Sequence, residues 1–225
     1  MDRHALADRL ASILQAHYAV LQVAPACLPR LTEQAAFMYI VELYRLQGWS
    51  PSLRNLRRGM FVLPGSPAAD PWNFSYVCLT RSDPEGWLEV RGNLAVLPLG
   101  ALQPIRPDVA VVHGGQVPTV GEAPLLRAEP QKPFALPNEM LLVFVEAKAA
   151  AVHPALVWSF VGLVLALCPE CITESEKHSR RGSILAASGG AASSLSVLEN
   201  DLKKRSYKVA IIPEIGESLL SLLSP

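Results

Sequence analysis

Residues 141–148 read Leu-Leu-Val-Phe-Val-Glu-Ala-Lys: five apolar residues followed by an acid, an alanine and a lysine. The continuous apolar run over 141–145 is expected of a central strand that is buried on both faces. Successive side chains of a strand point to opposite faces, so Glu146 and Lys148 should project together while Ala147 faces away. A carboxylate and an amine at the exit of a buried strand are costly unless they face a cleft or a metal.

A second ionisable group stands at the start of another apolar run. Pro107 and Asp108 directly precede the short β-branched stretch 109–112. If the two strands are neighbours, Asp108 completes a cluster of two carboxylates and one lysine. Such a cluster suits Mg²⁺, which takes one or two protein carboxylates and completes its shell with water and phosphate oxygens. The metal would acidify a water molecule, and Lys148 would orient that water or stabilise the pentacovalent phosphate.

The rest of the chain alternates between helical and extended periodicity. After the stretch 114–138, which is rich in proline and glycine, strands alternate with helices, and this order indicates parallel pairing and an α/β fold. The predicted helices span 3–22, 33–47, 154–168 and 192–205, with a short one after Pro213. The further predicted strands span 74–80, 87–97 with a break at Gly92-Asn93, 184–187 and 208–212.

Pro107-Asp108 and Glu146-Ala147-Lys148 resemble the motif of the PD-(D/E)xK nuclease superfamily, the restriction-endonuclease-like fold. The resemblance implies a three-layer α/β/α sandwich around a central mixed sheet, built from residues 31–225, with residues 1–30 as an N-terminal helical extension. It implies that Asp108, Glu146 and the backbone carbonyl of Ala147 hold Mg²⁺ or Mn²⁺. The first helix of that family often supplies a further acid, and Glu42 matches it by position.

The motif also departs from the family pattern. Asp108 and Glu146 are 38 positions apart, so the proline-rich stretch must be an excursion beside the site. Many members carry a polar residue just after the lysine, whereas alanines stand at 149 and 150, so the role of that residue is either absent or displaced to His153. A second acid-x-lysine triplet at 201–203 lies on a predicted helix surface, so the setting distinguishes the motif and the triplet alone does not.

Local patches must carry any argument about nucleic acid, because the chain has 20 basic and 20 acidic residues and no net charge. Two basic loop segments are expected to flank the cleft and contact phosphates without reading bases; they contain Arg54, Arg57, Arg58, Arg180 and Arg181. No recognition helix or zinc finger is evident, so we expect DNA binding without a sequence-specific reader. The weak general attraction to DNA leaves room for a partner protein that delivers the substrate, and helix 3–22 is a candidate homodimer interface.

Composition excludes several other classes. Half of the residues are hydrophobic and 18% are charged, which excludes disorder over most of the length. Four irregularly spaced cysteines do not make a disulfide framework, and with no secretory signal evident a cytoplasmic protein is expected. The apolar stretch 155–168 is too short to span a bilayer, so we interpret it as a buried helix, although a peripheral membrane role is an alternative.

Purely structural interpretations of the same residues stay open. Asp108 is a plausible turn residue, Glu146 and Lys148 a plausible solvated strand end, and Glu42 a plausible ion-pair partner of a neighbouring arginine. The main functional alternative to a nuclease is a non-catalytic subunit of the same fold. It would act as a binding or scaffold subunit of a larger nucleic-acid-processing or defence complex, with the 114–138 stretch as its contact surface.

Overall fold

The computed structural model of the chain describes residues 28–64, 70–82, 86–118, 134–171, 182–190, 195–204 and 209–215. Several sequence predictions fall outside these ranges. They concern helix 3–22 with its dimer role, Arg180 and Arg181, residues 119–133 of the proline-rich stretch, and most of the short helix after Pro213.

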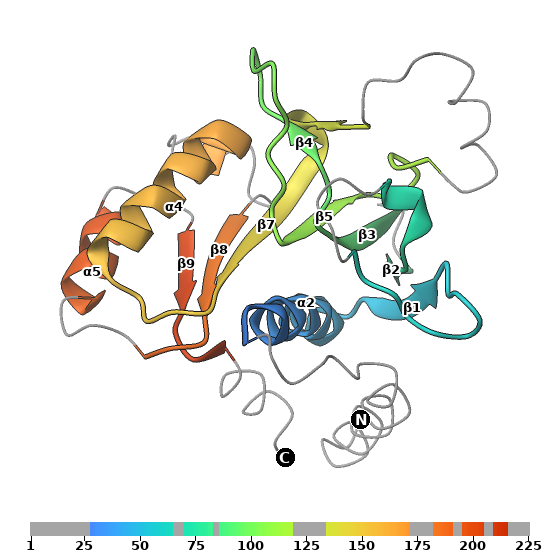
Figure 1. The fold of residues 1–225 in the computed structure, drawn as a ribbon, viewed down its shortest axis with the longest axis horizontal. Helices are drawn as coiled ribbons and strands as arrows, with labels where there is room; N and C mark the ends of the chain where they lie inside the picture. The colour runs from blue at the N-terminus through green and yellow to red at the C-terminus, as the bar shows by residue number, and fades with distance from the viewer. Residues whose placement is uncertain are drawn as a thin grey trace.

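A mixed seven-stranded sheet organises the described part of the chain (Figure 1). Its strands lie in the order β1-β2-β3-β5-β7-β8-β9; the pairs from β1 to β7 are antiparallel, and β7, β8 and β9 are parallel. The α/β class and the mixed central sheet predicted from the sequence are confirmed. The strands are β1 (Ser50–Arg54), β2 (Tyr76–Thr80), β3 (Trp87–Gly92), β5 (Val109–His113), β7 (Leu141–Lys148), β8 (Gly182–Ala187) and β9 (Val209–Ile212).

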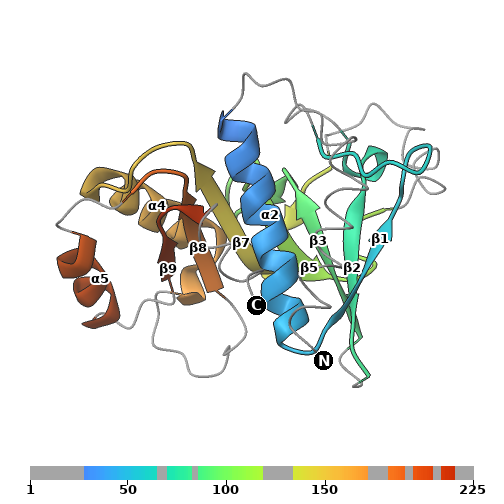
Figure 2. The same cartoon turned by 90° about the horizontal axis from the view of Figure 1, so that it is seen from below.

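Three helices cover the two faces of this sheet, an arrangement compatible with a three-layer sandwich. Helix α2 (Leu28–Leu46) packs on one face, mainly against β7, while α4 (Pro154–Leu167) and α5 (Leu195–Lys204) pack on the other (Figures 1 and 2). The small elements are β4 (Val96–Leu97), which pairs in parallel with β6 (Leu136–Pro137), and the 3₁₀ turns η1 (Pro71–Asn73), η2 (Asn138–Met140) and η3 (Pro169–Cys171). Within the described ranges, no helix combines the length and the apolarity needed to cross a membrane.

The alternation of side chains in the strands explains why both faces are apolar. In β5, Val109 and Val111 belong to the core beneath α2, and Ala110 and Val112 belong to the core beneath α4. All four are fully buried. A strand enclosed on both faces has no polar positions to alternate, which is why its sequence is a continuous apolar run.

Several details differ from the sequence predictions. Helix α2 already includes Leu28, five residues before the start predicted at residue 33. Strand β1 was not predicted; its Pro51 is tolerated because β1 is an edge strand, and Arg54 therefore ends a strand instead of lying in a loop. The break expected at Gly92-Asn93 is present: β3 ends at Gly92 and the left-handed residue Asn93 (φ 50°) turns the chain away, but the part beyond it, Val96–Leu97, pairs in a separate small sheet instead of continuing β3. Helix α4 buries one face only, since Trp158 on its other side is 44% exposed.

We expect Gly189→Ala to destabilise the fold by about 1–3 kcal/mol. Gly189 follows β8 and donates its N–H to the carbonyl of Ala150, and a Cβ at this position would lie 2.7 Å from the backbone nitrogen of Ala151. The three nearest atoms that a Cβ would meet all belong to the backbone of Ala150 and Ala151, so no flexible side chain can move aside.

The matched control is Gly162→Ala in α4, where a Cβ would meet nothing within 4 Å. This change should leave stability unchanged or raise it by up to about 1 kcal/mol, because alanine favours a helix. Urea denaturation of both variants measures the difference. Equal stability of the two would contradict the close approach at Gly189.

Candidate metal-binding and catalytic site

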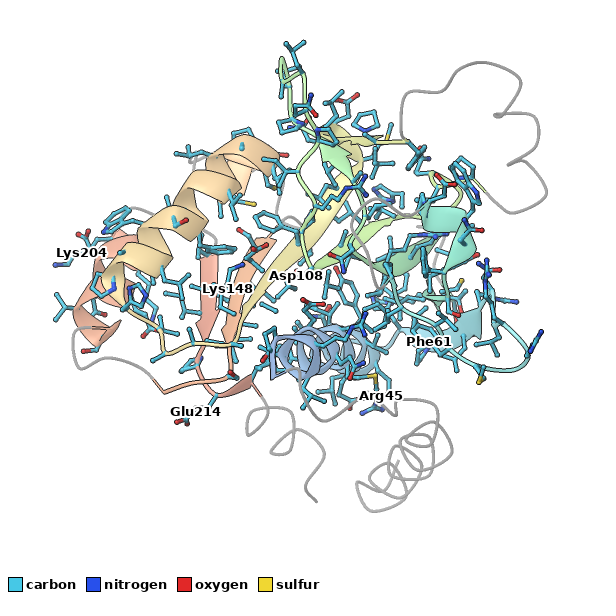
Figure 3. The ribbon with its side chains drawn as sticks, viewed as in Figure 1. Arg45, Phe61, Asp108, Lys148, Lys204 and Glu214 are labelled. Carbon is cyan, nitrogen blue, oxygen red and sulfur yellow. The ribbon has the colours of Figure 1, made fainter. Side chains whose placement is uncertain are left out.

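Strands β5 and β7 bring the predicted site residues together. They are antiparallel neighbours with Val109 opposite Val145, so Asp108 and Glu146 lie opposite each other one residue further along. The condition under which Asp108 joins the cluster, that the two strands are neighbours, is therefore met. Figure 3 shows Asp108 and Lys148 in the middle of the molecule, at the end of the sheet where β7 finishes.

Asp108 is held by the strand that carries the other two residues. Its Oδ2 accepts a hydrogen bond of 2.7 Å from the backbone N–H of Ala147. Burial and the nearby carboxylate of Glu146 raise the pKa of Asp108 to about 7, against the opposing effects of the Ala147 hydrogen bond and Lys148. These surroundings disfavour the ionised form of Asp108, and a cation bound beside it would stabilise that ionised form.

Pro107 has a structural role beside this hydrogen bond. The β5–β7 register places Pro107 opposite Ala147, whose N–H points towards β5 because it reaches the Asp108 carboxylate. The amide and carbonyl of one strand residue point to the same neighbouring strand, so the Ala147 carbonyl faces the same side. Proline has no N–H to donate to it. The proline–aspartate pair therefore leaves the Ala147 carbonyl without its ladder donor, next to the Asp108 carboxylate.

Glu146 and Lys148 project from the same face of β7, as the strand alternation predicts. The Lys148 Nζ lies 2.5 Å from Glu146 Oε1, and the two side chains are 40% and 15% exposed, respectively. Burial lowers the pKa of Lys148, but the hydrogen bond to Glu146 and the charges of Glu146, Asp108 and Glu33 outweigh it, so the pKa is raised. Lys148 is therefore an ammonium group that donates hydrogen bonds and carries positive charge to the site.

Glu33 is a fourth ionisable group of the site that the sequence analysis missed. It lies in the second turn of α2, and Figure 2 shows that α2 begins on the side where β7 ends. Burial raises the pKa of Glu33, Arg30 and Lys148 lower it, and Glu146 raises it. Its charge also acts on Asp108 and Lys148. Three carboxylates thus share this end of the sheet with two basic groups.

Glu42, the acid that the sequence favoured in this helix, does not join the cluster. It is 2% exposed, and Arg45 binds both of its carboxylate oxygens, with Nε 2.7 Å from Oε2 and Nη2 2.5 Å from Oε1. Glu42 lies nine positions after Glu33, which is about 13 Å along a helix. The structure thus agrees with the alternative interpretation of Glu42, as the ion-pair partner of a neighbouring arginine.

The other predicted residues take varied places. His153 caps α4, where its Nδ1 accepts from the N–H of Leu156 at 3.3 Å. Arg54 ends β1, and Arg57 and Arg58 are exposed in the segment that follows it.

The donor atoms present fit a hard divalent cation in a two-carboxylate arrangement. Within the described ranges, no group of three or more His, Cys, Asp or Glu side chains is placed to hold a metal ion. Mg²⁺ does not require one, because it commonly uses one or two carboxylates and fills its shell with waters and substrate oxygens. Asp108, Glu146 and the Ala147 carbonyl supply oxygen donors of that kind, and the mutual repulsion of the two acids favours a bound cation.

No family model matches the chain, and no curated protein or solved structure does either. The fold and the site thus define an α/β protein with a mixed sheet and an Asp-Glu-Lys cluster at one sheet end. Its function must be inferred from the chemistry of these residues.

Proposed function

We propose that the chain is a metal-dependent nuclease of the restriction-endonuclease-like fold that hydrolyses phosphodiester bonds, in DNA, through a PD-(D/E)xK-type site. The observation that supports this is the meeting of Asp108 with Glu146 and Lys148 on adjacent strands. Two repelling acids beside a charged lysine are poorly explained by folding stability alone. They suit a site that binds a cation and an anionic substrate together.

Each residue has a distinct role in this proposal. Asp108, Glu146 and the Ala147 carbonyl would hold Mg²⁺ or Mn²⁺, and Glu33 would add negative charge beside it. The bound metal would supply an acidified water and neutralise charge on the phosphate. Lys148 remains charged and would stabilise the additional negative charge on the phosphate in the transition state, which favours an electrostatic role over that of a base. Its partial exposure lets a large substrate reach it.

The experiment that tests this proposal is a cleavage assay with defined metals. Linear duplex DNA, single-stranded DNA and RNA are incubated with the purified protein in Mg²⁺, Mn²⁺ or EDTA. We expect duplex cleavage with either metal and none in EDTA. Cleavage that persists in EDTA, or in an Asp108→Ala variant, would assign the activity to a different site or a contaminant.

We expect Glu33→Gln to raise the Mg²⁺ concentration needed for half-maximal cleavage about 10-fold or more, because its charge adds to the cation's environment without being required for the reaction. The measurement is a Mg²⁺ titration of the cleavage rate, supported by the thermal shift that Mg²⁺ produces.

Glu42→Gln is the matched control for this prediction, since it makes the same change in the same helix. It should leave the Mg²⁺ dependence unchanged and lower stability by about 1–3 kcal/mol, because the partly buried Arg45 loses its charged partner. If the two variants exchanged these effects, Glu42 would be the site acid.

A non-catalytic binding subunit is the second candidate, and one feature favours it. The turn between β4 and Ile105 presents Leu99 and Leu102 with 90% and 95% of their surface exposed. The turn is fixed by reciprocal 2.8 Å hydrogen bonds between Val96 and Ile105. Exposed leucines on a fixed turn offer apolar surface that a partner protein would cover. Failure to cleave any nucleic acid with either metal, together with loss of a stable complex in Leu99→Ser, would favour this function.

A further inference from the structure

The segment after β1 forms a tight hairpin with an arginine at its tip. Arg57 and Met60 exchange backbone hydrogen bonds of 2.9 Å in both directions, and the two residues between them, Arg58 and Gly59, have φ angles of 51° and 76°. Two central residues with positive φ define the type I′ turn, which is preferred in two-residue β-hairpins. We call residues 57–60 the Arg57–Met60 hairpin.

Arg58 is an unusual choice at that position. The first central residue of a type I′ turn is preferably asparagine, aspartate or glycine, and a long side chain in the left-handed region costs on the order of 1 kcal/mol. Arg58 is nevertheless exposed, so it gains no packing that would offset this cost. Backbone strain that folding does not require is a reason to look for a function.

The base of the hairpin is anchored to the loop before β2 by the side chains of Asn55 and Ser75. Asn55 donates from Nδ2 to the carbonyls of Trp72 (2.8 Å) and Phe74 (2.7 Å), and Ser75 Oγ accepts from Val62 N–H and donates to the Asn55 carbonyl, both at 2.9 Å. These bonds fix the direction in which the hairpin projects. Its arginines are therefore presented on a defined support.

The charges of the hairpin are not used in ion pairs within the described ranges. The salt bridges found there join Glu42 to Arg45, Glu89 to Arg91 and Glu146 to Lys148. Arg57 donates to the neutral amide oxygen of Asn73 at 3.0 Å. Arg54 is also exposed at the end of β1. Three arginines thus lie close together in sequence with their charges open to an anionic partner.

The strand register places this hairpin at the same end of the sheet as Asp108. Arg54 at the end of β1 lies opposite Tyr76 at the start of β2. The register of β2 with β3 continues this row to Arg91, and Arg91 lies opposite Ala110 of β5. Asp108 is two residues before Ala110, so the chain leaves β1 on the side where β5 begins. Figure 2 shows the segment after β1 on the same side of the molecule as the start of α2 and the end of β7.

The distance between the two sites follows from the strand order. Three strand spacings separate β1 from β5 and four separate β1 from β7, which is roughly 14–19 Å across the sheet. Along a DNA axis this corresponds to about four to six base pairs. An elongated polyanion with regularly spaced phosphates can contact both places at once.

We propose that the Arg57–Met60 hairpin is a clamp for the sugar–phosphate backbone of duplex DNA, contacting it about four to six base pairs from the bond at Asp108. The inference rests on the proposed nuclease function, since it takes the substrate class from it. The hairpin supplies affinity and sets a minimum substrate length, while the cluster at β5 and β7 supplies the chemistry. Exposed Leu56 and Met60, each 41% exposed, flank the charges and suit contact with sugars.

The test measures binding separately from cleavage. Anisotropy of a labelled duplex of about 20 base pairs is followed in EDTA at several salt concentrations, for the wild type and for Arg57→Gln/Arg58→Asn. We expect affinity to fall about 10-fold and the slope of log K against log salt to decrease by about 2. Asparagine is favoured in a type I′ turn, so Arg58→Asn alone should melt no lower than the wild type.

Lys203→Gln/Lys204→Gln is the matched control, because it removes two exposed charges at the end of α5, on the α4 side of the sheet. Equal effects of the two double variants would overturn the clamp, as would wild-type binding of RNA as tight as duplex DNA. A duplex that extends only about three base pairs to each side of the bond at Asp108 cannot reach the hairpin. The wild type and Arg57→Gln/Arg58→Asn should bind such a duplex with equal affinity. Cleavage of the long duplex in Mg²⁺ reports on the nuclease function separately. Cleavage without hairpin-dependent binding would refute the clamp alone, and hairpin-dependent binding without cleavage would refute hydrolysis alone.

Discussion

Replacing Lys148 by methionine is expected to lower the rate of metal-dependent DNA cleavage by about 10²–10³-fold. Methionine keeps an unbranched apolar stem of similar size and removes the ammonium group that contacts Glu146. The raised pKa of Lys148 means that this positive charge is present throughout the neutral range. Its loss removes stabilisation of the charge that builds up on the phosphate during attack.

The fold should tolerate this change. The Lys148 side chain is 40% exposed, and the strand positions around it are buried independently of its charge. We expect circular dichroism and the melting temperature to stay close to those of the wild type. Rates are measured under single-turnover conditions at saturating Mg²⁺, so that a change in metal affinity is not mistaken for a change in the chemical step.

The chain provides its own control for the acid-x-lysine pattern. Asp201, Leu202 and Lys203 repeat the spacing of Glu146, Ala147 and Lys148, but they lie in helix α5, where Lys203 is exposed. Lys203→Met should therefore cleave at the wild-type rate. A Lys148→Met variant that retained more than about half of the activity would refute the catalytic role of this strand.

The order of apolar runs predicted most of the sheet, because strands buried on both faces have a sequence signature of their own. The pairing of β5 with β7, in contrast, could not be predicted from the apolar runs. The long stretch 114–138 separates these strands, and no local rule states which strands become neighbours across such an excursion. Asp108 was assigned to the site on the condition that they do, and the register of Val109 with Val145 meets it.

The acid of the first helix shows where periodicity stops being informative. A buried glutamate in an apolar run has two explanations, a metal site or a local partner, and Arg45 stands three residues after Glu42, a spacing at which helical side chains meet. Glu33 shares the sheet-facing stripe of Phe37 and Ile40, which the helical spacing does show. Which end of that stripe lies over the end of β7 is a tertiary fact, and the sequence does not carry it.

Strand β1 was missed for a related reason. Its five residues include Pro51 and are mostly exposed, so neither composition nor alternation marks them as a strand. Their identity comes from pairing with β2, where each of the five residues has a partner. Because β1 went unrecognised, the hairpin that follows it could be described only as a basic loop.

Asp108→Asn is expected to make the metal-free protein more stable at pH 8, by about 2–4 kcal/mol, and to leave it unchanged near pH 4. Folding raises the pKa of Asp108 from 3.8 to about 7. Between these values the folded state binds the proton more tightly than the unfolded state does. The contribution of Asp108 to the stability of the wild type therefore falls as pH rises through this window and is level above it.

The amide substitution separates charge from hydrogen bonding. Asparagine retains an oxygen that can accept the N–H of Ala147, while it cannot ionise beside Glu146 and Glu33. The expected gain corresponds to roughly 5–10 °C in melting temperature for a chain of this size. Thermal melts of wild type and variant at pH 4, 6 and 8, all in EDTA, measure it.

Mg²⁺ turns this stability difference into a test of the site. If the lower stability of the wild type at pH 8 arises from ionised carboxylates with no bound cation, millimolar Mg²⁺ should raise its melting temperature. The difference in melting temperature between Asp108→Asn and the wild type should then become smaller, because a ligand that binds only the folded state stabilises it. Sodium chloride free of divalent cations, at the same ionic strength, controls for the general screening of charge interactions by salt. A variant that is less stable than the wild type at pH 8 would show instead that the ionised Asp108 stabilises the fold, as a strand-end acid with only a structural role would do.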